Sequence, residues 1–135
     1  MPRPVVILAE DDGDLREVVQ TMLEQEGYRV VPCPNAFTAL RAFFTELRVD
    51  AMVLDWVLPD LDGRELVRLL HSQRELTEFP IVLTTGVNLE LPCFEGAVCL
   101  LRKPFAREDL LRLLHALTPH GTRAPSPEPG CFQVA

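Results

Sequence analysis

Five apolar runs of strand length alternate with segments of helical periodicity along the chain. The runs are residues 5–9, 28–31, 51–54, 81–85 and 97–101. Most of them lack the polar alternation of a half-exposed strand, which is typical of parallel strands that are covered on both faces. Parallel neighbours need helical crossovers of one hand, so the alternation predicts an α/β fold with a doubly wound, five-stranded parallel sheet.

The helical segments have apolar side chains at the i, i+3, i+4 spacing of an amphipathic helix. They lie in residues 15–23, 36–47, 66–70 and 110–117. Asp14 and Glu17 form a capping-box pattern, Gly27 is a natural stop, and Asn35 caps the next helix. Between residues 86 and 96 the periodicity is weak and Pro92 interrupts it. A helix in that segment is therefore expected to be short or missing.

Polar groups follow four of the five predicted strands. Glu10 and Asp11 come after the first strand, Asp55 after the third, Thr85 ends the fourth, and Lys103 follows the fifth. These side chains are expected to meet, because the carboxyl ends of parallel strands form one edge of the sheet, where ligands bind. Two carboxylates about 4 Å apart repel by roughly 4 kcal/mol at an effective dielectric constant of ~20. An all-oxygen cluster of this kind suits Mg²⁺ or Mn²⁺, and thus phosphoryl chemistry.

Composition narrows the function classes further. The chain has 135 residues and a net charge of −7, which opposes unaided binding to nucleic acid or to an anionic membrane. Its four cysteines show neither zinc-ligand nor disulfide-framework spacing. No apolar run approaches the ~20 residues that span a bilayer, so a cytoplasmic, soluble protein is expected. Residues 118–135 hold four prolines and two glycines, which is typical of a flexible tail or a linker.

Several short motifs occur together in the order found in one protein family. They are Ala9-Glu10-Asp11-Asp12, Asp55 followed by Leu58-Pro59 and Gly63, the run from Pro80 to Thr85, and Lys103-Pro104-Phe105. Through them, residues 5–117 resemble the receiver domain of bacterial two-component response regulators. The resemblance implies a flavodoxin-like sheet with strand order 2-1-3-4-5. It also implies a receiver domain over residues 1–117, followed by the Pro-rich tail or linker at 118–135.

The resemblance assigns a metal-binding role to the acids. It implies that Asp11, Asp55 and the backbone carbonyl of Val57 hold Mg²⁺ (or Mn²⁺), while Glu10 acts mainly through water or through contacts behind the metal ligands. Glu10 and Asp11 are favoured as the acid pair because they come first after the apolar strand. Asp12 is then expected to be a helix-entry residue.

The remaining family residues act on the phosphoryl group. Asp55 is expected to accept it from a histidine kinase or a phosphotransfer protein, Thr85 to receive a phosphate oxygen, and Lys103 to neutralise the acyl phosphate. The Lys103–Pro104 bond is expected to be cis. Phosphoryl transfer is mainly positioning and charge stabilisation, so these groups suffice. The chain is then a regulatory phosphoacceptor and no independent enzyme, assisting only its own phosphorylation and dephosphorylation and switching a surface for a downstream protein target or output domain.

Three features depart from the family pattern. The segment between Thr85 and Lys103 is about one helical turn, or ~4 residues, shorter than usual, and Leu100 stands where Tyr or Phe is common. Either a non-standard surface reads out activation, or the output is conventional and the short loop packs harmlessly. Val57 and Val87 are apolar where many relatives have polar groups, which predicts slow dephosphorylation.

Two other functions stay open at the level of sequence. One is an interaction module with the receiver fold that is not phosphorylated; Leu100 and the short segment favour it, whereas the intact acids oppose it. The other is a hydrolase that uses an aspartyl phosphate, which is disfavoured because that class places a second Asp two residues after its nucleophile, where this chain has Val57. The cognate kinase, the output target and the oligomeric state are not determined by the sequence.

Overall fold

The computed structural model describes residues 3–74, 80–86, 97–117 and 130–134. The strands are β1 (Val5–Ala9), β2 (Arg29–Cys33), β3 (Ala51–Asp55), β4 (Ile81–Thr85), β5 (Ala97–Arg102) and β6 (Gly130–Val134). The helices are α1 (Gly13–Gln25), α2 (Ala36–Thr45), α3 (Gly63–Arg74) and α4 (Arg107–Leu117).

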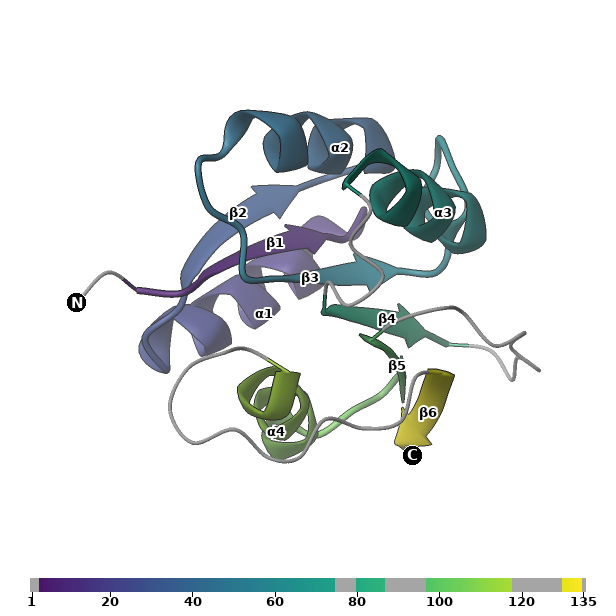
Figure 1. The fold of residues 1–135 in the computed structure, drawn as a ribbon. Coiled ribbons are helices and arrows are strands. Elements are labelled where there is room, and N and C mark those ends of the chain that lie inside the picture. The colour runs from purple at the N-terminus through teal and green to yellow at the C-terminus, as the bar shows by residue number, and fades with distance from the viewer. Residues whose placement is uncertain (1–2, 75–79, 87–96, 118–129, 135) are drawn as a thin grey trace.

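The strands form one parallel sheet in the order β2-β1-β3-β4-β5-β6. Helices α2 and α3 cover one face, and α1 and α4 cover the other (Figure 1). The doubly wound parallel sheet and the strand order 2-1-3-4-5 are therefore confirmed. Strand β6 extends this sheet beyond β5, and the hydrophobic pattern did not predict it.

Alternation along the central strands divides the core into two clusters. In β1, Ile7 packs in the cluster beneath α2 and α3, whereas Leu8 packs in the cluster beneath α1 and α4. Met52 and Val53 in β3 are divided in the same way, since successive side chains of a strand point to opposite faces. Every residue of β1, β3 and β4 is buried. Covering both faces thus explains why these strands read as unbroken apolar runs.

The start of α1 differs from the predicted one. Asp12 caps the helix, accepting hydrogen bonds from the N–H groups of Asp14 at 3.0 Å and Leu15 at 3.2 Å. Asp14 lies inside the first turn, so its predicted capping role is wrong, while Asp12 is the helix-entry residue. The end of α1 is as predicted, because Gly27 follows it with φ +95°, a conformation that glycine tolerates without strain.

Two predictions fall mainly on segments outside the described residues. The helix that was expected to be short or missing lies in residues 86–96, of which the structure describes only Gly86. Of the predicted tail, residues 118–129 and 135 are likewise outside the description, and residues 130–134 form β6. No helix in the described part of the chain is long and apolar enough to cross a membrane.

Candidate functional site

Three carboxylates meet at the carboxyl edge of the sheet. Strand β1 ends directly before Glu10 and Asp11, and β3, which pairs with β1, ends at Asp55. One oxygen of each carboxylate lies within 4.8 Å of the other two. Glu10 and Asp55 are buried, at 4% and 7% exposure, whereas Asp11 is exposed. The edge therefore holds a negative cluster that is open to solvent on one side.

Lys103 bridges the two buried acids. Its Nζ atom donates to Glu10 Oε1 at 2.7 Å and to Asp55 Oδ2 at 3.1 Å. Burial by itself lowers the pKa of Lys103, but the hydrogen bonds and charges of Glu10 and Asp55 outweigh it and raise the pKa above its usual value. The backbone N–H of Lys103 donates to the carbonyl of Thr85 at 2.7 Å, and the Lys103–Pro104 bond is cis. The positively charged amine of Lys103 is thus held between the two buried carboxylates by hydrogen bonds.

Glu10 is fixed by several other partners. Its carboxylate accepts a hydrogen bond from the N–H of Asp12 at 3.2 Å, and its own N–H donates to the carbonyl of Cys33 at 3.0 Å. Its carbonyl accepts a hydrogen bond from Arg16 Nη1 at 2.7 Å. No sequence pattern pointed to this role of Arg16, which is simply one residue of the predicted first helix. With both carboxylate oxygens engaged, Glu10 is suited to a supporting position behind the more exposed Asp11.

The loop after Asp55 folds back on itself. The N–H of Val57 donates to Asp55 Oδ1 at 3.3 Å, and Val57 pairs with Asp62 in an antiparallel bridge. The N–H of Gly63 donates to the carbonyl of Trp56 at 2.9 Å. A Cβ atom on Gly63 would lie 2.8 Å from Trp56 Cε3. Glycine is therefore required where the loop closes beneath the tryptophan.

Thr85 and Val57 differ sharply in exposure. Thr85 ends β4 at 1% exposure, and its neighbour Thr84 is the register partner of Asp55. Val57 is 65% exposed, and its backbone lies beside Asp55 because its N–H donates to Asp55 Oδ1. Of the predicted residues, the structure joins Lys103 directly to Glu10 and Asp55 through side-chain contacts and to Thr85 through its backbone.

Asp60 makes a contact that the sequence did not reveal. Its carboxylate accepts hydrogen bonds from the N–H groups of Ala36 at 2.9 Å and Phe37 at 2.8 Å, at the start of α2. Its slight burial raises the pKa of Asp60, but these and other backbone hydrogen bonds outweigh that effect and lower the pKa below its usual value. By sequence, Asp60 is simply an acid between Pro59 and Gly63 in a turn. Only the fold brings the first turn of α2 to it.

The acidic cluster fits a hard divalent cation. Glu10, Asp11 and Asp55 offer only carboxylate oxygens, which are the ligands that Mg²⁺ prefers. Lys103 supplies one positive charge against three negative ones, so the cluster keeps a net negative charge that a cation offsets. Asp11 is the solvent-exposed member of the cluster, so a hydrated ion that entered from solvent would meet its carboxylate first.

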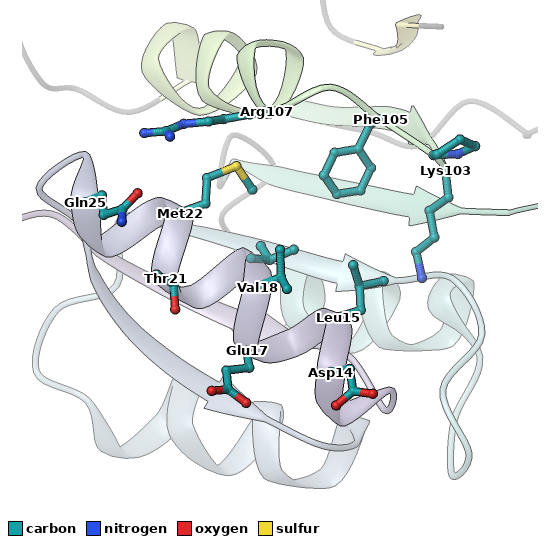
Figure 2. Close-up of a pocket in the computed structure, with 12 residues that line it drawn as sticks. Asp14, Leu15, Glu17, Val18, Thr21, Met22, Gln25, Lys103, Phe105 and Arg107 are labelled. Carbon is teal, nitrogen blue, oxygen red and sulfur yellow. The ribbon is translucent and has the colours of Figure 1, made fainter.

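A groove of about 970 Å³ lies beside the site, between α1 and residues 103–107. Figure 2 shows Leu15, Val18, Met22 and Phe105 along it, with Lys103 at one end. Charged and polar side chains also line it: Asp14, Glu17, Thr21, Gln25 and Arg107. The groove is thus an apolar surface with a charged border that leads to the lysine of the site.

The comparisons with known proteins agree on one family. The family model described as the response regulator receiver domain matches residues 6–115. The phosphate regulon transcriptional regulatory protein PhoB of Pseudomonas aeruginosa is 28% identical, with 83% of this chain and 50% of PhoB covered. The response regulator MprA of Mycobacterium avium is 34% identical, with 96% of this chain and 56% of MprA covered. The chain spans about half the length of these curated relatives.

Solved structures show the same likeness. One is the receiver domain of a sensor histidine kinase from Pseudomonas aeruginosa, with a magnesium ion coordinated in its active-site cleft. It is 29% identical to this chain, with a TM-score of 0.73, and the match covers 84% of this chain and 95% of that domain.

Proposed function

Because this chain belongs to the family of response regulator receiver domains, we propose that Asp55 accepts a phosphoryl group from a histidine kinase or a phosphotransfer protein. One observation carries the proposal. The Asp55 carboxylate lies at the carboxyl edge of the sheet, clustered with two other acids and 3.1 Å from Lys103 Nζ. A nucleophilic carboxylate, a cation site and a lysine are the groups that phosphoryl transfer needs.

The transfer itself needs little covalent chemistry from the protein. An oxygen of Asp55 attacks the phosphorus of a phosphohistidine, the P–N bond breaks, and the imidazole leaves with the electron pair. Lys103 already contacts Asp55 Oδ2, so a small movement of its amine brings it to a phosphoryl oxygen of the acyl phosphate. Thr85 ends the neighbouring strand, and its hydroxyl donates a hydrogen bond to another phosphoryl oxygen.

The proposed cation is Mg²⁺, or Mn²⁺ in its place. Asp11, Asp55 and the carbonyl of Val57 would hold it, with Glu10 acting through water. When bound, it supplies positive charge to the phosphoryl oxygens as negative charge spreads over them. Glu10 meanwhile keeps Lys103 in place through the 2.7 Å hydrogen bond between Oε1 and Nζ.

The groove in Figure 2 is the proposed docking surface for the phosphoryl donor. Leu15, Val18 and Met22 of α1 offer it apolar contacts, and the groove reaches Lys103. An amphipathic helix is a suitable occupant, because such helices bind by laying an apolar face into a groove of this kind. A donor bound there would present its phosphohistidine next to Asp55.

A second candidate is an interaction module that is never phosphorylated. Leu100 favours it, because it is 2% exposed and packed in the core, at a position where family members commonly have an aromatic ring. Such a module would bind its partner with the same affinity whatever the state of Asp55. The receiver function is preferred, because Lys103 and the three acids are all in place.

The lone tryptophan provides the test. Trp56 follows Asp55 and is partly buried, so its fluorescence is expected to change with Mg²⁺ and again with acetyl phosphate. Asp55→Asn should abolish the second change, and intact-mass analysis should show one phosphate on the wild type only. The absence of any covalent phosphate with acetyl phosphate or phosphoramidate would favour the interaction module instead.

A further inference from the structure

Helix α2 exposes an apolar stripe that faces away from the core. Phe37 and Phe44 are 77% and 54% exposed, and Arg41 lies between them. The spacings of four and three residues put these side chains on one line along the helix. The opposite side of α2 supplies the core through Ala39 and Phe43. These three residues, Phe37, Arg41 and Phe44, are called the α2 stripe below.

The stripe differs from scattered surface apolar residues, which are common and need no explanation. Its two phenyl rings stand at the same angle around one helix, two turns apart. The ring of Phe44 also packs edge-on against buried Phe43, with 5.5 Å between ring centroids and an interplanar angle of 77°. The core therefore holds one ring of the stripe in place before any partner arrives, which lowers the entropic cost of binding.

The charge of the stripe indicates the chemistry of its partner. No carboxylate among the described residues forms an ion pair with Arg41. The neighbouring cations are engaged, since Arg29 pairs with Glu46 at 2.7 Å and Arg48 with Asp50 at 3.0 Å. On a chain with a net charge of −7, this face offers a positive charge that no carboxylate of the described segments pairs, between two apolar side chains. A complementary partner has a carboxylate between two apolar side chains.

Asp60 connects the stripe to the acidic site. The loop that begins at Asp55 places the carboxylate of Asp60 against the N–H groups of Ala36 and Phe37, at 2.9 and 2.8 Å. Asp60 comes five residues after Asp55, and Phe37 is the first member of the stripe. A rearrangement of the loop on phosphorylation therefore reaches the first turn of α2 through two hydrogen bonds.

We propose that the α2 stripe binds an acidic amphipathic helix of a partner protein, and that the phosphorylation state of Asp55 sets the affinity through Asp60. The second half of this statement rests on the proposed function, whereas the first half does not. Seven residues of helix span about 10.5 Å. The partner helix therefore has apolar residues at i and i+7 and an Asp or Glu at i+3 or i+4, opposite Arg41.

A displayed library of helical peptides tests the surface. The peptides have leucine fixed at i and i+7 and random residues between them, and they are selected against the full chain. Enriched peptides should have an acid at i+3 or i+4, and Arg41→Glu should shift the preference to Lys or Arg. Phe37→Ser should weaken binding at least about tenfold, the loss that follows removal of an aromatic anchor.

Arg112→Glu is the matched control, because it makes the same charge change at an exposed position of α4. It should leave both affinity and peptide preference unchanged. A selection without acid preference, or peptides that bind Phe37→Ser as well as the wild type, would remove the stripe as a docking site. A dimer in light scattering that Phe37→Ser abolishes would make a second copy of this chain the occupant, and the proposed partner would be wrong.

The coupling is tested with Mg²⁺ and beryllofluoride, which forms an acyl-phosphate analogue on Asp55. Loading is first checked by Trp56 fluorescence. In the loaded wild type the affinity for the selected peptide should change about fivefold or more, and in Asp60→Ala it should not change. Failure to load contradicts the proposed function and leaves the peptide result standing. Normal loading with unchanged affinity would show that Asp60 transmits nothing.

Discussion

Lys103 balances the charges of the acidic edge, since it contacts both buried carboxylates. Lys103→Met is expected to reduce the free energy of unfolding in metal-free buffer by about 2 kcal/mol. That is less than the roughly 3–5 kcal/mol lost when a fully buried pair is broken, because Lys103 is partly exposed. Urea unfolding of the wild type and of Lys103→Met, in EDTA and again in Mg²⁺, measures this loss of unfolding free energy. Mg²⁺ should recover part of the loss, and an equal loss in both buffers would contradict the account.

Val57 is expected to slow dephosphorylation. The residue is 65% exposed, and its backbone N–H contacts Asp55 Oδ1, so its apolar side chain is expected to hinder water that approaches an acyl phosphate on Asp55. Val57→Asn would offer that water a hydrogen bond, and loss of phosphate from the purified phosphoprotein should become faster. An unchanged decay would remove the hypothesis. Val87, its predicted counterpart, lies outside the described residues.

Single residues were predictable where a strand fixes their place. Asp55 and Lys103 follow apolar runs, and the carboxyl ends of parallel strands lie at one edge of the sheet whatever the conformation of the loops. Asp14 was assigned the wrong role because Asp12 fits an N-cap equally well, and short-range pattern does not separate two acids two residues apart. Asp60 was missed because its hydrogen-bond donors lie 23 and 24 residues earlier in the chain.

The first turn of helix α2 has a second acceptor besides its N-cap Asn35, because Asp60 of the β3–α3 loop accepts hydrogen bonds from the N–H groups of Ala36 and Phe37. The pKa of Asp60 is lower in the folded protein than its ordinary value of about 3.9. The ionised carboxylate therefore stabilises the fold at pH values above about 3.9, and this stabilisation is lost as the pH falls through the lowered pKa. Asp60→Asn is expected to cost at most about 1 kcal/mol at neutral pH, the scale of an exposed helix cap. Urea unfolding should show the difference shrinking progressively below about pH 4. A difference that does not depend on pH would contradict it.

The turn into α3 depends on the absence of a side chain at Gly63. An added Cβ meets the Cε3 atom of Trp56 at 2.8 Å and its backbone Cα and carbonyl oxygen at 3.1 and 3.2 Å. Gly63→Ala should therefore cost about 1–3 kcal/mol of unfolding free energy and shift the fluorescence of Trp56. Gly86→Ala is the matched control, since nothing lies within 4 Å of a Cβ added at Gly86. Equal stability of the two variants would contradict the steric argument.

Elements were predictable in proportion to their burial. The runs of β1, β3 and β4 are buried at every position. An unbroken apolar run of this short length is typical of a buried strand, so these three elements were predicted. Strand β6 was not predicted because residues 130–134 follow a Pro-rich stretch. Its existence depends on pairing with β5, which is a tertiary interaction that no local pattern reports.

The domain is expected to fold even when β6 is removed. Every described member of the two core clusters lies at or before Leu117. A chain of residues 1–117 should therefore unfold cooperatively in urea and keep its Mg²⁺ response. It should self-associate more than the full chain in light scattering, because β5 becomes an edge strand with unpaired backbone groups. Loss of cooperative unfolding would place β6 within the folding unit.

The fold and the family could be predicted from the whole sequence, whereas the surface that binds a downstream partner could not. The doubly wound parallel sheet follows from the alternation of strands and helices and from the handedness of crossovers, and the strand order was implied by the family resemblance, whose motifs are spread along the entire chain. A docking surface such as the α2 stripe is exposed by definition, so it breaks no periodicity. Its coupling to the site also depends on a hydrogen-bonded contact between distant segments, through Asp60.

Complete burial of the central strands has a consequence for amide hydrogen exchange. Amides inside β1, β3 and β4 become accessible only when the domain opens globally, so their exchange should report its full stability. The N–H of Trp56 still donates to the carbonyl of Thr84 at 2.7 Å, whereas, among the described residues, that of Val57 donates only to Asp55 Oδ1 and Val57 is exposed, so the loop from Val57 onward should exchange by local opening. Protection should thus fall steeply after Trp56, directly beside Asp55, which marks where a rigid scaffold ends and a movable segment begins.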